Sequence, residues 1–224
     1  MTSLSDRNIH APLSGYLREA TQQEHDAVNH AVMSGGMFTD ATGYRAFVLL
    51  QYLFHRDISP LYDNQDLAHI VPDLAARNRF RQVSADMADL GVALPASGAP
   101  PGITDPSTAI GWLYVAEGSK LGANFLIKLA GKMGFNENSG ARHLAPDPMG
   151  RGPSWAAFRK AMDNAQLDPE RCLQGARDSY ARVKSYIPVL KHPADTVPSG
   201  PAHHGTHAHH TDASGGSGRT VKWY

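Results

Sequence analysis

A single histidine near the start of the chain has the surroundings that a metal ligand needs. On a helical wheel drawn through residues 17–32, apolar side chains cover roughly one third of the circumference, and His25 lies at the edge of that arc. A neutral imidazole there can point one ring nitrogen into an apolar cavity, while Asn29 or a backbone carbonyl orients the other. The same position also suits a structural histidine that makes one hydrogen bond. Helix position alone does not separate the two interpretations.

Two glycines lie four residues apart in the segment YVAEGSKLGANF, which otherwise has the composition of a helix. A glycine in a helix interior costs ~1 kcal/mol relative to alanine, so Gly118 and Gly122 together weaken the helix by about 2 kcal/mol. The bare backbone on this face permits either close packing of a second helix or contact with a flat, rigid ligand. Ser119 and Asn124 are the small neutral polar residues nearby. The apolar side chains that could line a cavity beside the glycines are Trp112, Val115, Leu121, Phe125 and Leu126.

The other histidines have weaker claims to a role in chemistry. His30 falls outside the apolar arc, His55 precedes Arg56 and Asp57, and His69 and His143 lie in or near predicted loops. We interpret these four as structural. Five of the twelve histidines lie between residues 203 and 210, where they could hold Zn²⁺, Ni²⁺ or Cu²⁺, or belong to a flexible extension.

The elements that must position these residues are helices. Helical periodicity is common along the chain, whereas strand alternation and hairpin turns are nearly absent. Asp105 followed by Pro106 predicts the start of the glycine-containing helix, with the aspartate as N-cap. The fold class predicted is all-α, in a single compact multi-helix domain. Its helices are expected at 12–32, 40–59, 72–90, 105–134, 154–165 and 169–190.

The chain divides into a packed part and a tail. Residues 1–192 are expected to form the helical domain. Residues 193–224 contain almost no core-forming side chains and are rich in His, Gly and Ser, so they cannot offset their ordering entropy and are expected to form a flexible tail.

Composition limits the classes of partner. Lys and Arg together number 21, as do Asp and Glu, so the formal net charge is zero and a nucleic-acid partner is not indicated. One cysteine, Cys172, excludes an internal disulfide, and we find neither a signal peptide nor a membrane-spanning segment. We therefore expect a cytoplasmic protein, with no membrane or nucleic-acid contact, that is a monomer.

Three segments, in this order and spacing, resemble the haem (heme) oxygenase family. LREATQQEHDAVNHAV is similar to the family's proximal-helix motif, with His25 at the position of the haem-iron ligand. GWLYVAEGSKLGANF is similar to the distal helix, with Gly118 and Gly122 at the haem-contacting glycines. GARHLAPDPMGRGPSWAAF is similar to the region after that helix in the bacterial, biliverdin-producing branch associated with iron acquisition. The resemblance covers residues 13–190 and excludes the tail.

Two positions depart from the pattern seen in other members. Ser119 stands where the mammalian-type distal motif has an aspartate, which places the chain nearer the bacterial branch. Asn29 replaces the carboxylate that often partners the proximal histidine, which weakens the expected hydrogen bond to the imidazole.

The resemblance implies a defined reaction. Haem would be both cofactor and substrate, and O₂ and electrons from a donor such as ferredoxin and its reductase would open the ring to biliverdin, CO and ferrous iron. Residues 106–133 contain neither histidine nor arginine, so proton delivery near Gly118, Ser119 and Gly122 would rely on backbone groups and ordered water. The isomer of biliverdin, the physiological donor and the choice between iron acquisition and bilin supply are left open.

The haem propionates would need cations at the mouth of the pocket. Arg18 is the first candidate, since it lies seven residues before His25, and Tyr114 could donate a hydrogen bond. Arg177 and Lys184 share one face of the last helix and are weaker candidates, because a solvated helix face explains them better. Asn124 and Phe125 complete the expected haem-binding set.

Two other classes of protein are alternatives to a haem oxygenase. A di-iron carboxylate bundle requires Glu-x-x-His pairs, and none of the five glutamates has a histidine three residues later. A non-catalytic haem-binding or haem-delivery protein would keep both His25 and an apolar pocket, so it remains the alternative.

Overall fold

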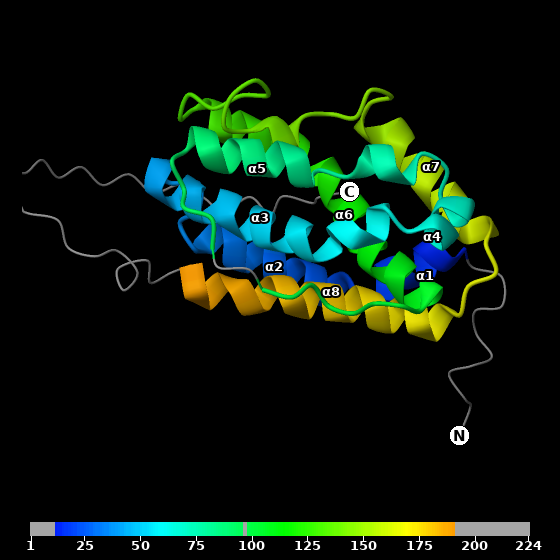
Figure 1. The fold of residues 1–224 in the computed structure, drawn as a ribbon. Helices are drawn as coiled ribbons and strands as arrows, with labels where there is room; N and C mark the ends of the chain where they lie inside the picture. Colours follow the sequence, from blue (N-terminus) through cyan, green and yellow to red (C-terminus); the bar gives the residue numbers. More distant parts are fainter. Residues whose placement is uncertain (1–11, 96–97, 191–224) are drawn as a thin grey trace, which may run out of the picture.

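The computed structural model describes residues 12–95 and 98–190, and the regular structure of these residues is helical (Figure 1). The all-α prediction is therefore confirmed. In chain order the elements are α1 (Leu13–Ala20), α2 (Gln22–Ser34), α3 (Ala41–Tyr62), α4 (Gln65–Ile70), the 3₁₀-helix η2 (Leu74–Arg77), α5 (Phe80–Asp89), α6 (Pro106–Gly131), the 3₁₀-helix η3 (Arg142–Leu144), α7 (Arg151–Asn164) and α8 (Pro169–Leu190).

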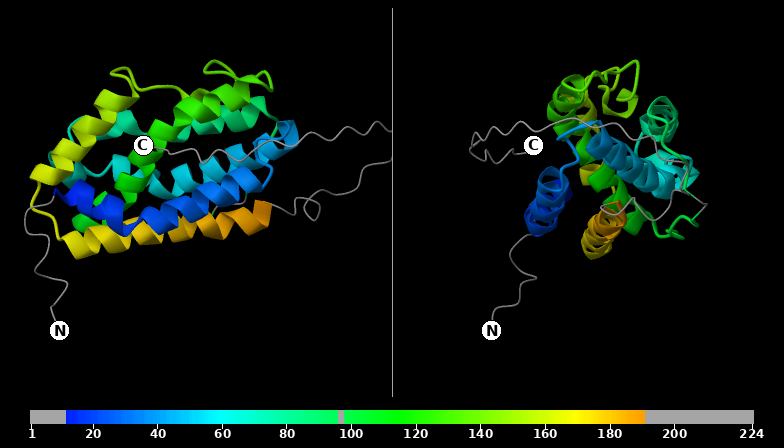
Figure 2. Two further views of the ribbon diagram at one scale, coloured as in Figure 1. Left: turned by 180° about the vertical axis from the view of Figure 1, so that it is seen from behind. Right: turned by 90° about the vertical axis from the view of Figure 1, so that its left-hand side faces the viewer.

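Helix α6 forms the centre of the bundle. Every residue of α6 from 109 to 117 is buried, so this part of the helix is covered on all sides. Helix α8 packs along α6, α7 packs on α6 from another side, and α2 and α3 both contact α8 (Figures 1 and 2). The proximal segment in α2 and the glycine segment in α6 thus belong to one packed body.

Two glycines other than the predicted pair allow α6 and α8 to approach each other. A Cβ atom added to Gly111 would lie 2.1 Å from the carbonyl oxygen of Cys172, and one added to Gly175 would lie 2.1 Å from that of Thr108. Such distances exclude any side chain at either position. Close packing of α6 against α8 therefore occurs at Thr108 and Gly111, about two to three turns before Gly118.

We expect Gly111→Ala to destabilise the protein by about 1–3 kcal/mol, because its methyl group must push the α8 backbone away. Gly131→Ala is the matched control, since a Cβ at the last residue of α6 meets no atom within 4 Å. Urea unfolding of both variants measures the difference. Equal stability of the two would contradict the close approach of α6 and α8.

Helix α6 begins where the sequence predicted. Asp105 is its N-cap, with the carboxylate accepting a hydrogen bond from the Thr108 amide at 2.8 Å, and Pro106 is its first residue. The helix predicted at 12–32 is instead broken at Thr21, where α1 ends and α2 begins. Thr21 is buried, and its hydroxyl donates to the Leu17 carbonyl at 2.7 Å, which ties the chain at the break.

Two further helix boundaries differ from the prediction. Pro60 does not end α3, which continues for two more residues to Tyr62; the proline costs the helix one hydrogen bond, and α3 ends within the next turn. The helix predicted at 72–90 is divided into η2 and α5, and Asp73, the residue before η2, has a left-handed backbone with φ 62°. Residues 151–153 add a first turn to α7 ahead of its predicted start at 154.

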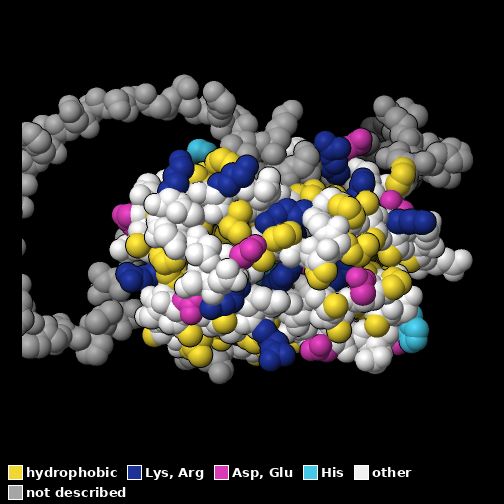
Figure 3. All heavy atoms as spheres, turned by 90° about the horizontal axis from the view of Figure 1, so that it is seen from above, with side chains coloured by type: hydrophobic (Ala, Val, Ile, Leu, Met, Phe, Trp, Pro, Cys, Tyr) yellow, Lys and Arg dark blue, Asp and Glu magenta, His cyan; other side chains and the backbone are white. Residues whose placement is uncertain are grey.

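The surface agrees with a balanced charge. On the face seen in Figure 3, Lys, Arg, Asp and Glu side chains lie among hydrophobic and neutral ones. Among the helices of residues 12–95 and 98–190, none combines the length and the hydropathy that crossing a bilayer requires. The predicted tail at 193–224 lies outside the described residues.

Candidate haem site

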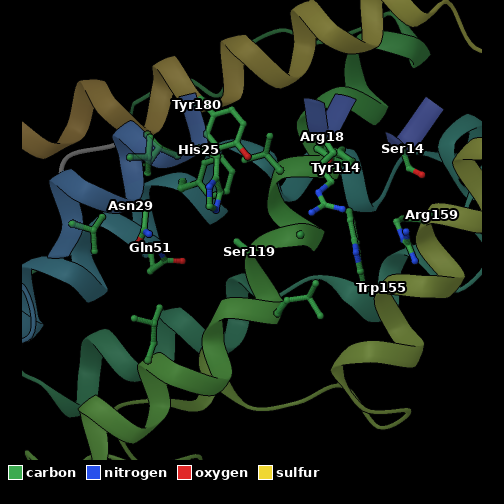
Figure 4. A pocket seen from close by; sticks show the side chains of 18 of the residues that line it. Ser14, Arg18, His25, Asn29, Gln51, Tyr114, Ser119, Trp155, Arg159 and Tyr180 are labelled. Carbon is green, nitrogen blue, oxygen red and sulfur yellow. The ribbon is translucent and has the colours of Figure 1, made fainter. Parts of the chain in front are cut away.

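A cavity of about 780 Å³ opens between α1 and α2 on one side and α6 on the other, a size typical of ligand-binding pockets (Figure 4). Helices α3, α7 and α8 complete its walls. Most of the lining is apolar, and these side chains are Val28, Val32, Phe47, Phe54, Val115, Leu121, Leu126 and Val183.

His25 lines this cavity from α2, one turn after the break at Thr21. Its side chain is 14% exposed, and Nδ1 lies 3.1 Å from Oδ1 of Asp26. The ring of Tyr180 meets the imidazole edge-on, with centroids 6.5 Å apart at 84°. With Nδ1 beside a carboxylate, Nε2 is the nitrogen suited to bind a metal. Asn29, which the sequence suggested as the orienting group, lines the cavity one turn further along.

The glycine segment of α6 provides the opposite wall. A Cβ added to Gly118 would meet only the ring of Trp155, at 3.6–3.9 Å, which is ordinary van der Waals contact. No neighbouring backbone therefore requires glycine at this position, in contrast to Gly111. Of the two explanations weighed for this glycine, close helix packing fails, and contact with a ligand in the cavity remains. Gly122 is buried one turn later, between Leu121 and Leu126 of the lining.

Ser119 lies beside Gly118 on the cavity wall, and Figure 4 shows it across the pocket from His25. Its hydroxyl donates a hydrogen bond to the carbonyl of Ala116 at 2.7 Å. The hydroxyl proton is thus engaged within the helix, and the oxygen is left to accept.

The charged groups of the cavity gather at one end (Figure 4). Arg18 comes from α1 and Arg159 from α7, where the Arg159 guanidinium lies 5.8 Å from the ring centroid of Trp155. Asp163, on the same face of α7, accepts from the backbone amide of Ser14 at 2.7 Å and from its hydroxyl at 2.8 Å. This carboxylate is therefore tied to the start of α1.

Most of the predicted site residues lie on the cavity. Arg18, His25, Tyr114, Gly118 and Ser119 line it together, although they come from three helices.

Four predicted residues are absent from the described lining of the cavity: Gly122, Asn124, Phe125 and Arg177. Asn124 is exposed, because six residues of helix turn it about 120° away from Gly118. Phe125 faces the same way as Gly118 but lies two turns further along, packed against the core. Arg177 is half-exposed and pairs with Glu24 at 3.1 Å. Its role in the structure is to join α8 to α2 next to His25.

Gln51, Trp155, Arg159 and Tyr180 are among the lining residues that the sequence analysis did not predict. Trp155 lay within the segment GPSWAAF that carried part of the resemblance, and Arg159 follows it by one helical turn. Tyr180 is three residues after Arg177, so it neighbours that residue on α8, about 60° away round the helix. Gln51 carried no signal, since its place depends on the packing of α3.

A second histidine is buried behind the cavity and should affect stability. Burial lowers the pKa of His55, and the nearby positive charges of His143, Lys120 and Arg79 lower it further. Its charge-free form is thus favoured in the folded protein, while the unfolded chain takes up a proton below about pH 6.5. Stability from His55 is present above that pH and is lost as the pH falls below it.

We therefore expect the free energy of unfolding to fall by about 1 kcal/mol between pH 6.5 and pH 5.5 on account of His55. His55→Gln should remove this part of the slope, whereas His69→Gln, at an exposed residue, should not. Urea unfolding across the pH range gives the two slopes. Identical slopes for His55→Gln and the unaltered protein would contradict the assignment.

The lining fits a metal carried by a flat organic ring better than a bare ion. In the described part of the chain no group of three His, Cys, Asp or Glu side chains could hold a metal ion. A single imidazole suffices only when other ligands accompany the metal, as four ring nitrogens do in haem. The open face at Gly118, the apolar walls and the guanidinium groups at one end suit such a ring with acidic substituents.

Comparison with known proteins also points to a protein that acts on haem. The heme oxygenase family model matches residues 11–188. Heme oxygenase PigA of Pseudomonas aeruginosa is 40% identical over 167 residues, which cover 72% of this chain and 84% of that relative. The NO- and CO-bound heme oxygenase of Neisseria meningitidis has a TM-score of 0.77 and 36% identity, and the match covers 85% of this chain and 98% of that one.

A more distant structure agrees on the fold alone. Heme oxygenase-1 from the cyanobacterium Synechocystis, solved in complex with heme, has a TM-score of 0.62 at 19% identity, with 80% of this chain and 92% of that chain covered. The family match spans nearly all the described helices. The chain therefore belongs to the haem (heme) oxygenase family and has that family's oxygenase activity.

Proposed function

We propose that this protein cleaves haem to biliverdin, CO and ferrous iron, with O₂ and electrons as co-substrates. The observation that carries the proposal is the pairing of His25 with the open backbone at Gly118 across one cavity. Haem, when bound, supplies the redox-active iron and is itself the ring that is cleaved. The protein has to bind it, orient it and control the supply of protons.

His25 would hold the iron through Nε2. The carboxylate of Asp26, 3.1 Å from Nδ1, favours the tautomer whose proton is on Nδ1, and Tyr180 restricts rotation of the ring. A neutral imidazole is a weaker electron donor than a thiolate, which suits a reaction that must avoid early O–O cleavage. This end of the site would therefore set the position of the iron.

The opposite wall would supply hydrogen bonds without a strong acid. The residues of α6 that line the cavity are Tyr114, Val115, Gly118, Ser119, Leu121 and Leu126, and the nearby Glu117 is buried elsewhere. Ser119 can accept a hydrogen bond from water, since its own proton goes to Ala116. Protons would thus reach the reacting centre through water and backbone groups.

The propionates would lie at the end that carries Arg18 and Arg159. Guanidinium groups bind carboxylates with two parallel hydrogen bonds, which fixes the rotation of the ring within its plane. That rotation decides which meso carbon faces the reactive side. Asp163 does not compete, because Ser14 already binds both of its oxygens.

Electrons would come from outside the protein, from a donor such as ferredoxin and its reductase. Ferrous iron would be a product of the reaction, separate from biliverdin and CO, so turnover would release a usable metal. Iron acquisition from haem is the physiological role that we propose on this ground.

The test follows the fate of bound haem. The ferric haem complex is mixed with ascorbate, or with ferredoxin, its reductase and NADPH, in air. We expect the Soret absorbance to disappear while biliverdin is extracted and CO is trapped in equal amount. A Soret band that persists, with neither product formed, would contradict the proposal and favour a haem-delivery protein.

A further inference from the structure

The side of α6 that faces away from the cavity carries a cluster of buried charges directly behind Gly118. Glu117 is 1% exposed, and its carboxylate has three partners. One oxygen accepts from the Tyr62 hydroxyl at 2.8 Å and pairs with the Lys120 ammonium at 2.7 Å, and the other accepts from Arg77 at 3.0 Å. The carboxylate therefore joins α6 to α3 and to η2.

The same cluster holds the helix on the other side of Gly118 and Ser119. The Lys120 ammonium donates to the backbone carbonyl of Arg77 at 2.9 Å. The Arg151 guanidinium, from α7, donates to the backbone carbonyl of Lys120 at 3.0 Å. Residues 117 and 120 are thus both fixed from behind, and the two cavity-facing residues lie between them.

The cluster also reaches the aromatic ring that covers Gly118. Arg77 donates to both the carbonyl and the hydroxyl oxygen of Ser154, each at 3.2 Å, and Ser154 precedes Trp155 in α7. One guanidinium therefore contacts the carboxylate beside Gly118 and the backbone beside Trp155. The two walls of this part of the cavity share a support.

Stability alone is a poor reason for such an arrangement. Three cations, Arg77, Arg79 and Lys120, meet three carboxylates, which are those of Asp73, Glu117 and Asp147. Removing charges from water is costly, and well-packed apolar residues often stabilise a core as well as or better than a buried ion pair. What the charges add is direction, since each hydrogen bond fixes the angle as well as the distance of its partners.

The part of α6 at Gly118 needs its position and orientation to be fixed in this way. Gly118 has no side chain of its own, so the distance between the α6 backbone and a ring in the cavity depends on how the helix and the neighbouring Trp155 are held. The separation has to be set by what holds the helix from behind. A shift of ~1 Å in the position of a reacting group can cost about 100-fold in rate.

Resting on the function proposed above, we propose that Glu117, Lys120 and Arg77 are positioning residues that set the distance and rotation of the Gly118–Ser119 backbone relative to the haem ring. None of the three is on the described lining of the cavity. Their effect passes through the backbone of α6 and through Trp155.

The experiment compares Glu117→Gln, the double variant Glu117→Gln/Lys120→Met, and Asp105→Ala. The single variant leaves Arg77 and Lys120 with one carboxylate too few, whereas the double variant restores the balance of charge. Asp105→Ala is the matched control, because it weakens the same helix at its far end by removing the N-cap and the ion pair with Arg171. Each protein is assayed for its unfolding midpoint, haem affinity, haem consumption and, without haem, hydrogen exchange at residues 115–122.

We expect Glu117→Gln to lower the rate of haem consumption by ~10- to 100-fold while haem affinity changes by less than about 3-fold. Hydrogen exchange at 115–122 should rise about 10-fold without haem. The double variant should recover the unfolding midpoint but neither the rate nor the protection from exchange. Asp105→Ala should lower the unfolding midpoint and keep both the wild-type rate of haem consumption and the wild-type protection from exchange.

Three results would overturn the inference. Glu117→Gln could show the wild-type rate of haem consumption and wild-type hydrogen exchange at 115–122, or the double variant could recover both. The third is a loss of rate in Asp105→Ala equal to that in Glu117→Gln. If the unaltered protein fails to consume haem, the proposed function is wrong. Hydrogen exchange in the haem-free variants still shows whether the Glu117 cluster restrains residues 115–122 of α6.

Discussion

Replacement of His25 by alanine is expected to lower the rate of haem consumption by about 100-fold or more, because the imidazole is the one histidine side chain on the described lining of the cavity. The apolar walls and the guanidinium groups at the far end are unchanged, so haem should still enter the cavity. Absorption and resonance Raman spectra of the complex should show that the histidine ligand is gone, and stopped-flow mixing with ascorbate measures the rate.

Added imidazole provides a test of the cause. It should occupy the space left in His25→Ala and restore a histidine-type spectrum together with part of the rate. His30→Ala is the matched control, since His30 is exposed on the same helix five residues later and should have no effect. A His25→Ala protein with a histidine-type spectrum and no added imidazole would contradict the assignment of the ligand.

Substitution of Gly118 by alanine should change stability and activity in opposite directions. A methyl group there meets only the Trp155 ring at van der Waals distance, so Gly118→Ala should raise the stability of the haem-free protein by up to ~1 kcal/mol. The same group would narrow the part of the cavity wall that Gly118 shares with Trp155, where the haem ring would lie. We expect haem consumption to fall in Gly118→Ala and to fall by at least about 10-fold further in Gly118→Leu, whose side chain fills more of the cavity.

Urea unfolding of the haem-free proteins and the Soret assay measure the two effects. Gly131→Ala is the control for helix propensity, because its methyl group meets no atom within 4 Å at the end of α6. It should raise stability and leave haem consumption unchanged. A Gly118→Leu protein that consumes haem at the wild-type rate would show that the ring does not lie against this backbone.

The comparison of Gly118 with Gly111 shows what sequence alone could and could not supply. Both glycines interrupt the same helix, and the cost of each in helix propensity is the same. Only the positions of neighbouring atoms reveal that Gly111 lies against the backbone of α8 while Gly118 faces the cavity. The resemblance singled out Gly118 as haem-contacting, and the packing shows that no neighbouring backbone requires a glycine there.

Local signals predicted local structure well. The cap at Asp105 and the start of α6 depend on residues within one turn, and both were confirmed. The break at Thr21 was missed, because the residues around it continue to favour a helix. There the Leu17 carbonyl accepts hydrogen bonds from both the Thr21 hydroxyl and the Thr21 amide, so the backbone bond at the break is the one a continuous helix would also make.

The candidate site shows the same division. Arg18, His25 and Tyr114 could be chosen from their own helices, and the structure places all three on the cavity. Arg159 could not, since its contribution depends on α7 folding back onto α1, a contact made by Ser14 and Asp163 across 149 residues of sequence. Long-range contacts of this kind are set by packing, which periodicity does not report.

The central claim is that haem lies in the cavity between His25 and the Gly118 backbone. The most direct measurement is anomalous diffraction at the iron absorption edge from crystals of the haem complex. We expect one iron peak at coordination distance from Nε2 of His25, with the Gly118–Ser119 backbone on the opposite side of the ring. A peak outside this cavity, or one not bound to His25, would contradict the account.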